Sequence, residues 1–134
     1  MHPDRYGHCI HGSGPDQGGE PVERDTIDDR YKWRLDKIFP DFESWEACCA
    51  EVQEALPSLA ELQWTLATGA GPLLAAVSAI HGIQRRLEKA HVFAAMKSDE
   101  DTRISENIAH KGRVSSLAVA FAEAVSWFES EVLA

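Results

Sequence analysis

The sequence predicts an all-α domain that follows a glycine-rich tail. Apolar residues recur at spacings of three and four along most of the chain, as they do on the buried face of an amphipathic helix. No segment shows the strict apolar and polar alternation that is typical of a strand. We therefore expect an antiparallel helical hairpin or bundle of two long helices with short helices packed against it.

The chain of 134 residues has the size of one domain. Residues 1–28 are rich in glycine and proline and poor in large apolar side chains, so burial cannot offset the entropy of ordering this segment. We expect residues 1–28 to be a disordered tail and residues 29–134 to be the helical domain.

A lead-in segment precedes the helices. Apolar residues from Trp33 to Phe39 alternate loosely with charged ones, and Pro40 closes the run. This pattern predicts an extended segment docked on the domain. Asp41 is the expected N-cap of the first helix, since a carboxylate there accepts a hydrogen bond from a free backbone N–H.

The first helix is predicted over Phe42–Leu56. Its apolar positions recur with helical spacing at Trp45, Cys48 or Cys49, Val52 and Leu56.

Pro57 fits the first turn of a helix better than its interior, because proline lacks the N–H that interior positions donate. The sequence therefore predicts a second, short helix over Ser58–Ala67, bent away from the first. Its core face is Leu59, Leu62 and Leu66.

Two long helices follow. The first is predicted over Pro72–Lys97, with a buried stripe of Leu73, Val77, Ile80, Leu87, Ala90 and Ala94. The second is predicted from Thr102 to the end of the chain, with the acidic stretch Ser98–Thr102 supplying its N-cap. Its stripe is Val114, Leu117 or Ala118, Phe121, Val125, Phe128 and Val132. Small residues on this helix, Gly112, Ser115, Ser116, Ala118, Ala120 and Ala122, are expected to let a neighbouring helix approach closely.

Charge and cysteine content exclude several classes of function. The net charge of −9 would repel nucleic acid phosphates and anionic lipid. Three cysteines, two of them adjacent, do not make a disulfide framework, and no export signal opens the chain, so a cytoplasmic location is expected. The uncharged stretch 62–84 contains Gly69, Gly71 and Pro72, which predict a turn between helices instead of a membrane span.

No residue forms a convincing metal or cofactor site. The tail residues His2, His8, Cys9 and His11 are soft ligands, but a structural zinc site needs a stiff frame. His81, His91 and His110 are expected to be packing or surface residues, and no histidine begins the His-Glu-x-x-His motif of metallopeptidases.

Nucleophilic and acidic candidates are also better explained by structure. The cluster Asp99, Glu100 and Asp101 lacks the spacing of a calcium-binding EF-hand loop and is expected to cap a helix. Cys48 and Cys49 are adjacent and do not have the spacing of a redox-active Cys-x-x-Cys motif. We expect both to be small packing residues of a helix, with acidic neighbours that raise the thiol pKa. Ser115 and Ser116 lack a Gly-x-Ser-x-Gly context. The sequence therefore predicts no catalytic, cofactor-binding or metal-binding residue in this chain.

Four runs of the sequence resemble the N-terminal region of oligoendopeptidase F, in the thimet-oligopeptidase-like group of zinc metallopeptidases. They occur in order and at compatible spacing between Arg30 and Ala134. The runs are Trp33–Pro40 with Trp45 after it, Lys97–Thr102, Gly112–Ala118 and Ser126–Leu133. Two positions depart from the pattern, His91 in place of an aromatic residue and Ser130 in place of proline.

The resemblance implies a much longer cytoplasmic enzyme that cleaves short peptides in a deep channel. It also implies a zinc ion on a His-Glu-x-x-His helix far downstream, so zinc is expected only in a full-length family member. The matching part would be a helical N-terminal lobe that walls the channel, in a chain truncated before the catalytic domain.

Three roles follow from these observations. The chain is expected to be a non-catalytic domain or truncated homologue of such a peptidase, meeting oligopeptides only together with a catalytic domain. The alternative is a stand-alone helical interaction module, possible as a homodimer. A subunit that works beside a separately encoded catalytic chain is a third role.

Overall fold

The computed structural model describes residues 23–134, which form two compact units divided between Lys32 and Trp33. The described part of the first unit contains two 3₁₀ turns, Arg24–Thr26 and Asp29–Tyr31. Most of the predicted tail, residues 1–28, lies outside the described residues, so its disorder stays a prediction.

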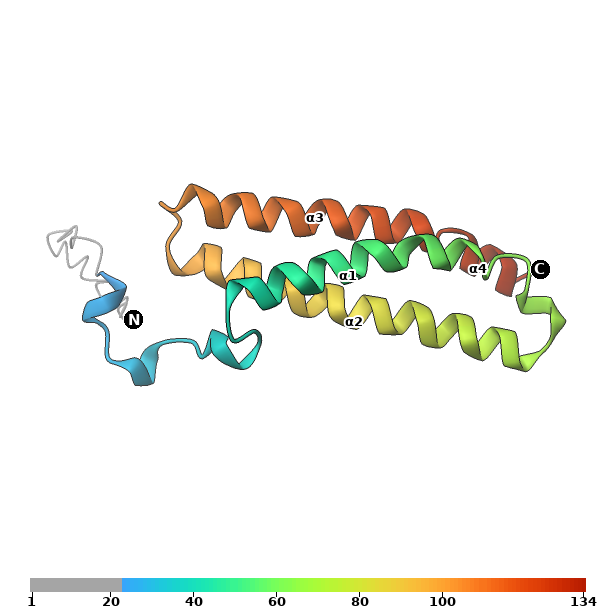
Figure 1. Ribbon diagram of the computed structural model, residues 1–134, viewed down its shortest axis with the longest axis horizontal. Coiled ribbons are helices and arrows are strands. Elements are labelled where there is room, and N and C mark those ends of the chain that lie inside the picture. The colour runs from blue at the N-terminus through green and yellow to red at the C-terminus, as the bar shows by residue number, and fades with distance from the viewer. Residues whose placement is uncertain (1–22) are drawn as a thin grey trace, which may run out of the picture. The chain divides into compact units, whose positions relative to one another are not determined.

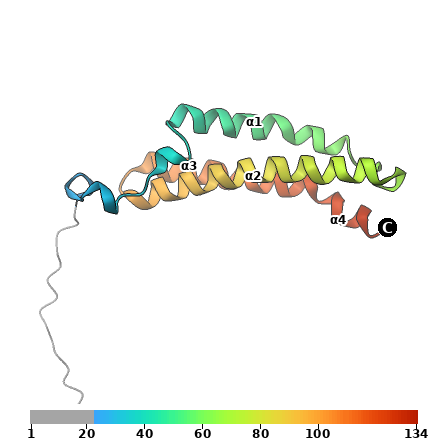
Figure 2. The same ribbon diagram turned by 90° about the horizontal axis from the view of Figure 1, so that it is seen from below.

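The second unit is built from α-helices. They are α1 (Phe42–Ala60), α2 (Ala70–Glu100), α3 (Ser105–Val125) and the short α4 (Trp127–Val132). α1, α2 and α3 lie side by side and run in alternating directions, and each contacts the other two (Figures 1 and 2). No strand occurs within residues 23–134. The all-α prediction is confirmed.

The predicted break at Pro57 is wrong. α1 runs through Pro57 and ends at Ala60, so the predicted helix over Ser58–Ala67 does not form. The chain then passes through turns into a single 3₁₀ turn, Leu66–Thr68. Continuing the helix places Leu59 seven residues after Val52 on the same face, where both side chains are fully buried. Burial of Leu59, worth about 1.5 to 3 kcal/mol, offsets much of the local cost of proline.

The lead-in segment docks on the helices, as predicted, but it is not simply extended. Leu35 and Phe39 are buried, and Leu35–Lys37 forms a 3₁₀ turn that contacts α2. The Phe39 ring meets the edge of Phe93, with the ring centroids 5.4 Å apart and the planes at 79°. This edge-to-face contact anchors the segment to α2.

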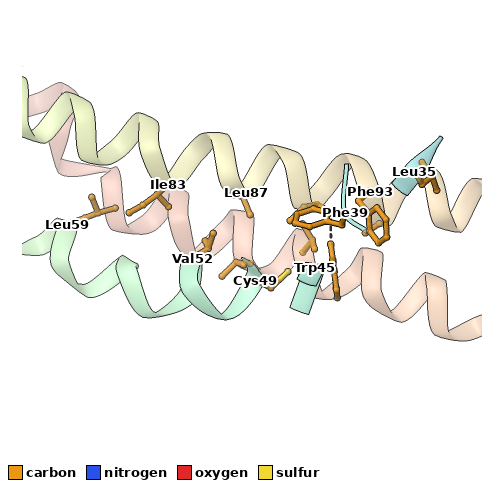
Figure 3. Packing of buried hydrophobic residues seen from close by; sticks show 13 residues of the cluster. Leu35, Phe39, Trp45, Cys49, Val52, Leu59, Ile83, Leu87 and Phe93 are labelled. Carbon is orange, nitrogen blue, oxygen red and sulfur yellow. Dashed lines mark hydrogen bonds between the residues drawn. The ribbon is translucent and has the colours of Figure 1, made fainter. Parts of the chain in front are cut away.

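The core lies between α1, α2 and α3 (Figure 3). Trp45, Cys49, Val52 and Val114 are almost completely buried, as their spacing predicts. Three core residues of α2 were not predicted, Ala76, Ile83 and Phe93. Leu73 and Val132 were predicted to be buried but are exposed, because each lies in an end turn of its helix, beyond the face that the neighbouring helices cover.

The last helix is interrupted at Ser126, where a single helix was predicted. The Ser126 N–H and hydroxyl both donate to the Glu123 carbonyl, and the Trp127 indole N–H donates to the Ala124 carbonyl at 2.8 Å. These bonds tighten the backbone to an i→i+3 pattern, which ends α3 before α4 begins.

Close helix packing at the small residues of α3 is not observed at Gly112. This residue is exposed, and a Cβ added there would meet no atom within 4 Å. Ser115 and Ser116 are exposed too, and each hydroxyl donates to a backbone carbonyl four residues earlier. These residues face solvent because Val114 and Leu117 take the buried face of α3.

Candidate functional site

The histidines considered as metal ligands are spread over two helices. His81 and His91 are exposed on α2, while His110 is half-buried on α3 and stacks 4.1 Å from the Phe42 ring. Within residues 23–134, no group of three or more His, Cys, Asp or Glu side chains is arranged to hold a metal ion. The tail candidates His2, His8, Cys9 and His11 lie outside the described residues.

Cys48 and Cys49 are packing residues of α1, as predicted. Burial, the larger cause, raises the pKa of the Cys49 thiol to about 11, although the Arg113 guanidinium opposes the shift. The pKa of Cys48 is raised as well, first by burial and then by Glu51. Acidic neighbours therefore contribute less than burial. Neither thiol has the depressed pKa that a nucleophile requires.

The acidic stretch at the junction of α2 and α3 does not supply the predicted N-cap. α3 begins after Ile104, whose apolar side chain accepts no capping hydrogen bond. Asp101 instead accepts hydrogen bonds from the backbone N–H of Arg103 at 2.9 Å and from its guanidinium. These bonds lower the pKa of Asp101 to about 2.

Asn107 closes the same junction from the other helix. Its side-chain amide donates to the Lys97 carbonyl at 3.1 Å, which caps the last turn of α2. The run Lys97–Thr102 thus forms a helix-to-helix corner and not a ligand site.

Trp45 joins all three long helices. Its indole N–H donates to the Ala90 carbonyl of α2 at 2.9 Å, a bond drawn in Figure 3. The Arg113 guanidinium of α3 lies 5.7 Å from the ring centroid of Trp45 and pairs with Glu46 of α1 at 3.1 Å. Trp45 therefore positions α1 against both partners through packing, a hydrogen bond and a cation–π contact.

Glu131 of α4 is hydrogen-bonded to the turn between α1 and α2, and we call this contact the Glu131 clasp. One carboxylate oxygen accepts the backbone N–H of Trp64 at 2.7 Å, and the other accepts that of Leu66 at 2.9 Å. A carboxylate that accepts two backbone N–H groups forms strong, charge-assisted bonds. Sequence reasoning missed this contact, because residues 65 and more positions apart give no local signal of pairing.

Among the hollows on the surface of the helical unit, two lie beside α1 or its end. One, of about 370 Å³, lies between α1 and α3 and is lined by Cys49, Gln53, Leu56, Arg113, Ser116, Leu117 and Ala120. The other, of about 470 Å³, lies between the α1–α2 turn and α4 and includes Trp64, Trp127 and Glu131. We call the second one the tip hollow, and the end of the unit that carries it the tip. No helix within residues 23–134 is both long and apolar enough to cross a membrane.

The sequence of this chain is similar to parts of several bacterial peptidases. Group B oligopeptidase PepB of Streptococcus agalactiae serotype III (strain NEM316) is 30% identical over 110 residues, which are 82% of this chain and 18% of that protein. The chromosomal oligoendopeptidase F of Lactococcus lactis subsp. cremoris is 31% identical over 112 residues, with the same coverage. Oligopeptidase PepF of Bacillus subtilis (strain 168) is 29% identical over 111 residues, 83% of this chain and 17% of that protein.

No family model matches the chain, and no solved structure gives a significant match. The curated relatives agree with one another in name and in the share of this chain that they cover. The chain spans less than a fifth of their length. The sequence resemblance noted above is thus confirmed, and the chain is a homologue of one part of the oligoendopeptidase F peptidases.

Proposed function

We propose that this chain is a non-catalytic helical domain of an oligoendopeptidase F-type peptidase, corresponding to its N-terminal lobe and acting in the cytoplasm. The observation that carries the proposal is the coverage of the matches, 82% of this chain against 18% of the relative. In this proposal the zinc ion and the oligopeptide substrate are held by other parts of the enzyme.

The roles of the resembling runs support the proposal. Leu35, Phe39 and Trp45 of the first run are core residues, and Val114 and Leu117 of the third run pack beside them. The second run forms a corner between helices, and the fourth supplies the Glu131 clasp. A set of residues that builds a rigid helical unit suits a lobe that shapes access to a site elsewhere.

The test is an assay of the purified, washed chain. We expect no cleavage of short peptides and no stoichiometric zinc by elemental analysis. Detection of either would contradict the proposal, since no group within residues 23–134 is arranged to hold a metal ion.

The neighbouring gene sequence offers a second test of the same proposal. The reading frame downstream of this one should encode a His-Glu-x-x-His segment if a split or interrupted peptidase is present. Absence of such a segment would favour an independent role, including that of a stand-alone module.

The runner-up function is a helical interaction module that pairs with a second copy of itself. It is favoured by apolar side chains exposed at the tip, among them Trp64, Leu74 and Leu133. Size-exclusion chromatography with light scattering separates the two functions. A monomer at micromolar concentration would count against the module.

A further inference from the structure

Trp64 is held outward by a strained backbone. Its side chain is 80% exposed, and its φ of 69° is the single positive value among the non-glycine residues that the structure describes. A bulky residue in the left-handed region costs on the order of 1 kcal/mol, and such strain gathers at functional positions. The fold therefore maintains an unfavourable backbone while leaving most of the Trp64 side chain exposed.

The Glu131 clasp fixes this conformation. Its carboxylate binds the N–H of Trp64 and the N–H of Leu66, which is 7% exposed. The turn is thereby tied on one side to α4 and on the other to the core. Trp64 is displayed by a braced turn and not by a loose loop.

The surroundings of Trp64 are apolar and hollowed. The tip hollow, about 470 Å³, is lined beside Trp64 by Ala67, Trp127 and the end of α4. Leu74, in the first turns of α2, is 67% exposed, and Leu133 is 79% exposed. The α1–α2 turn, the start of α2 and α4 lie at the same end of the helical unit (Figures 1 and 2). Tryptophan is one of the residue types enriched among the anchor residues of protein interfaces.

The tip carries negative charge only. Neither residues 38–84 nor residues 114–134 contain a lysine or arginine, and the tip includes Glu61, Glu129 and Glu131. A second copy would place acidic groups against acidic groups, and anionic lipid would be repelled in the same way. The fitting partner is an apolar protein surface bordered by lysine or arginine.

We propose that the tip docks onto the part of an oligoendopeptidase F-type peptidase that this chain does not match, with Trp64 as the anchor. The inference rests on the function proposed above, and it adds which surface of the lobe makes the contact. The relatives supply a partner of the required size, because more than four fifths of their length lies outside the matched region.

Split complementation tests the proposal. The full chain is co-expressed with Bacillus subtilis PepF from which the 111 matched residues have been removed, and association and peptide cleavage are measured. The variant Trp64→Asn removes the ring while keeping a residue that tolerates the left-handed backbone. Val119→Asn is the matched control, since Val119 is 60% exposed on α3.

We expect the wild-type chain and V119N to associate and restore cleavage, and W64N to bind on the order of tenfold or more weakly, as at an anchor residue. Raised salt should also weaken association, because the contact pairs unlike charges. Equal complementation by W64N and wild type would overturn the docking surface and leave the proposed function standing. Failure of the wild-type chain to complement would count against the proposed function itself.

The isolated chain gives an independent check. Light scattering should show a monomer for wild type and W64N alike. A wild-type dimer that W64N abolishes would mean that a second copy occupies the tip, which would overturn the proposal whatever the outcome of complementation.

Discussion

At the scale of single residues, Glu131 makes the most specific prediction. Glu131→Gln removes the negative charge and turns an amide NH₂ toward one of the two backbone N–H groups that the carboxylate now accepts. Loss of charged hydrogen bonds of this kind costs about 2 kcal/mol. We expect the free energy of unfolding, measured with urea, to fall by about that amount.

Glu129 is the matched control for this experiment, because it lies on the same short helix with an exposed side chain. Glu129→Gln should leave the free energy of unfolding nearly unchanged. If both variants behaved alike, the clasp would contribute nothing to the stability of the tip.

The two described cysteines make a second residue-scale prediction. Cys49 is 1% exposed with a thiol pKa of about 11, and burial also raises the pKa of Cys48. Alkylation needs an accessible thiolate, so in a Cys9→Ser background the native chain should resist iodoacetamide near pH 8 and react fully in denaturant. Mass spectrometry counts the adducts. Ala50→Cys, at an exposed position of α1, should add one rapidly modified thiol.

At the scale of elements, Pro57 destabilises α1 locally, while the continued helix buries Leu59 in the core. Pro57 is exposed and lies within α1, where proline donates no hydrogen bond and crowds the preceding turn, at a cost of about 3 kcal/mol. Pro57→Ala should raise the free energy of unfolding by about 1 to 2 kcal/mol once the greater entropy of the unfolded chain is allowed for.

Ser58→Ala, in the same turn, is the control for this variant and should be close to neutral. A loss of stability in P57A would mean that the proline bend is required to bring Leu59 into the core. Urea unfolding measures both variants.

The corner between α2 and α3 predicts a dependence on pH. Hydrogen bonds from Arg103 lower the pKa of Asp101 to about 2, so the folded state favours the carboxylate. A depressed pKa contributes stability above the unfolded value, near 3.8, and this contribution is lost as pH falls through about 2. The thermal midpoint of wild type should exceed that of Asp101→Asn at neutral pH.

The difference between the two midpoints should shrink between pH 4 and 2, as Asp101 takes up a proton. A difference that stays constant over this range would show that the carboxylate charge is not what holds the corner.

At the scale of the whole molecule, the net charge of −9 sets the response to salt. Like charges repel one another in the compact state, and raising ionic strength from about 0.01 to about 1 M shortens the screening length from roughly 30 to 3 Å. The thermal midpoint should therefore rise with sodium chloride. A fall would mean that the ion pairs, such as Arg113 with Glu46, outweigh the general repulsion.

The sequence predicted much of this fold because most of its signals are local. The periodic apolar residues placed both ends of α1 and α2 and the start of α3 within four residues, and Asp41 caps α1 through the Ser44 N–H at 2.7 Å, as expected. The failures have two causes. At Pro57 the burial of Leu59 against other helices was not visible in the local sequence. At Ser126 and in the Ser98–Thr102 stretch, short-range hydrogen bonds to Glu123 and from Arg103 took the place of the helix continuation and the N-cap that were predicted.

The amino-acid sequence by itself determined the helical class, the approximate starts of the main helices and the resemblance to oligoendopeptidase F, because each depends on residue types at short spacing. Only the tertiary structure decided that α1 continues through Pro57, that Trp45 bonds to Ala90, and that Glu131 holds Trp64 outward. These pairs are separated by 45 and 67 residues. Packing brings them together, and no local pattern of residues records which distant groups will meet.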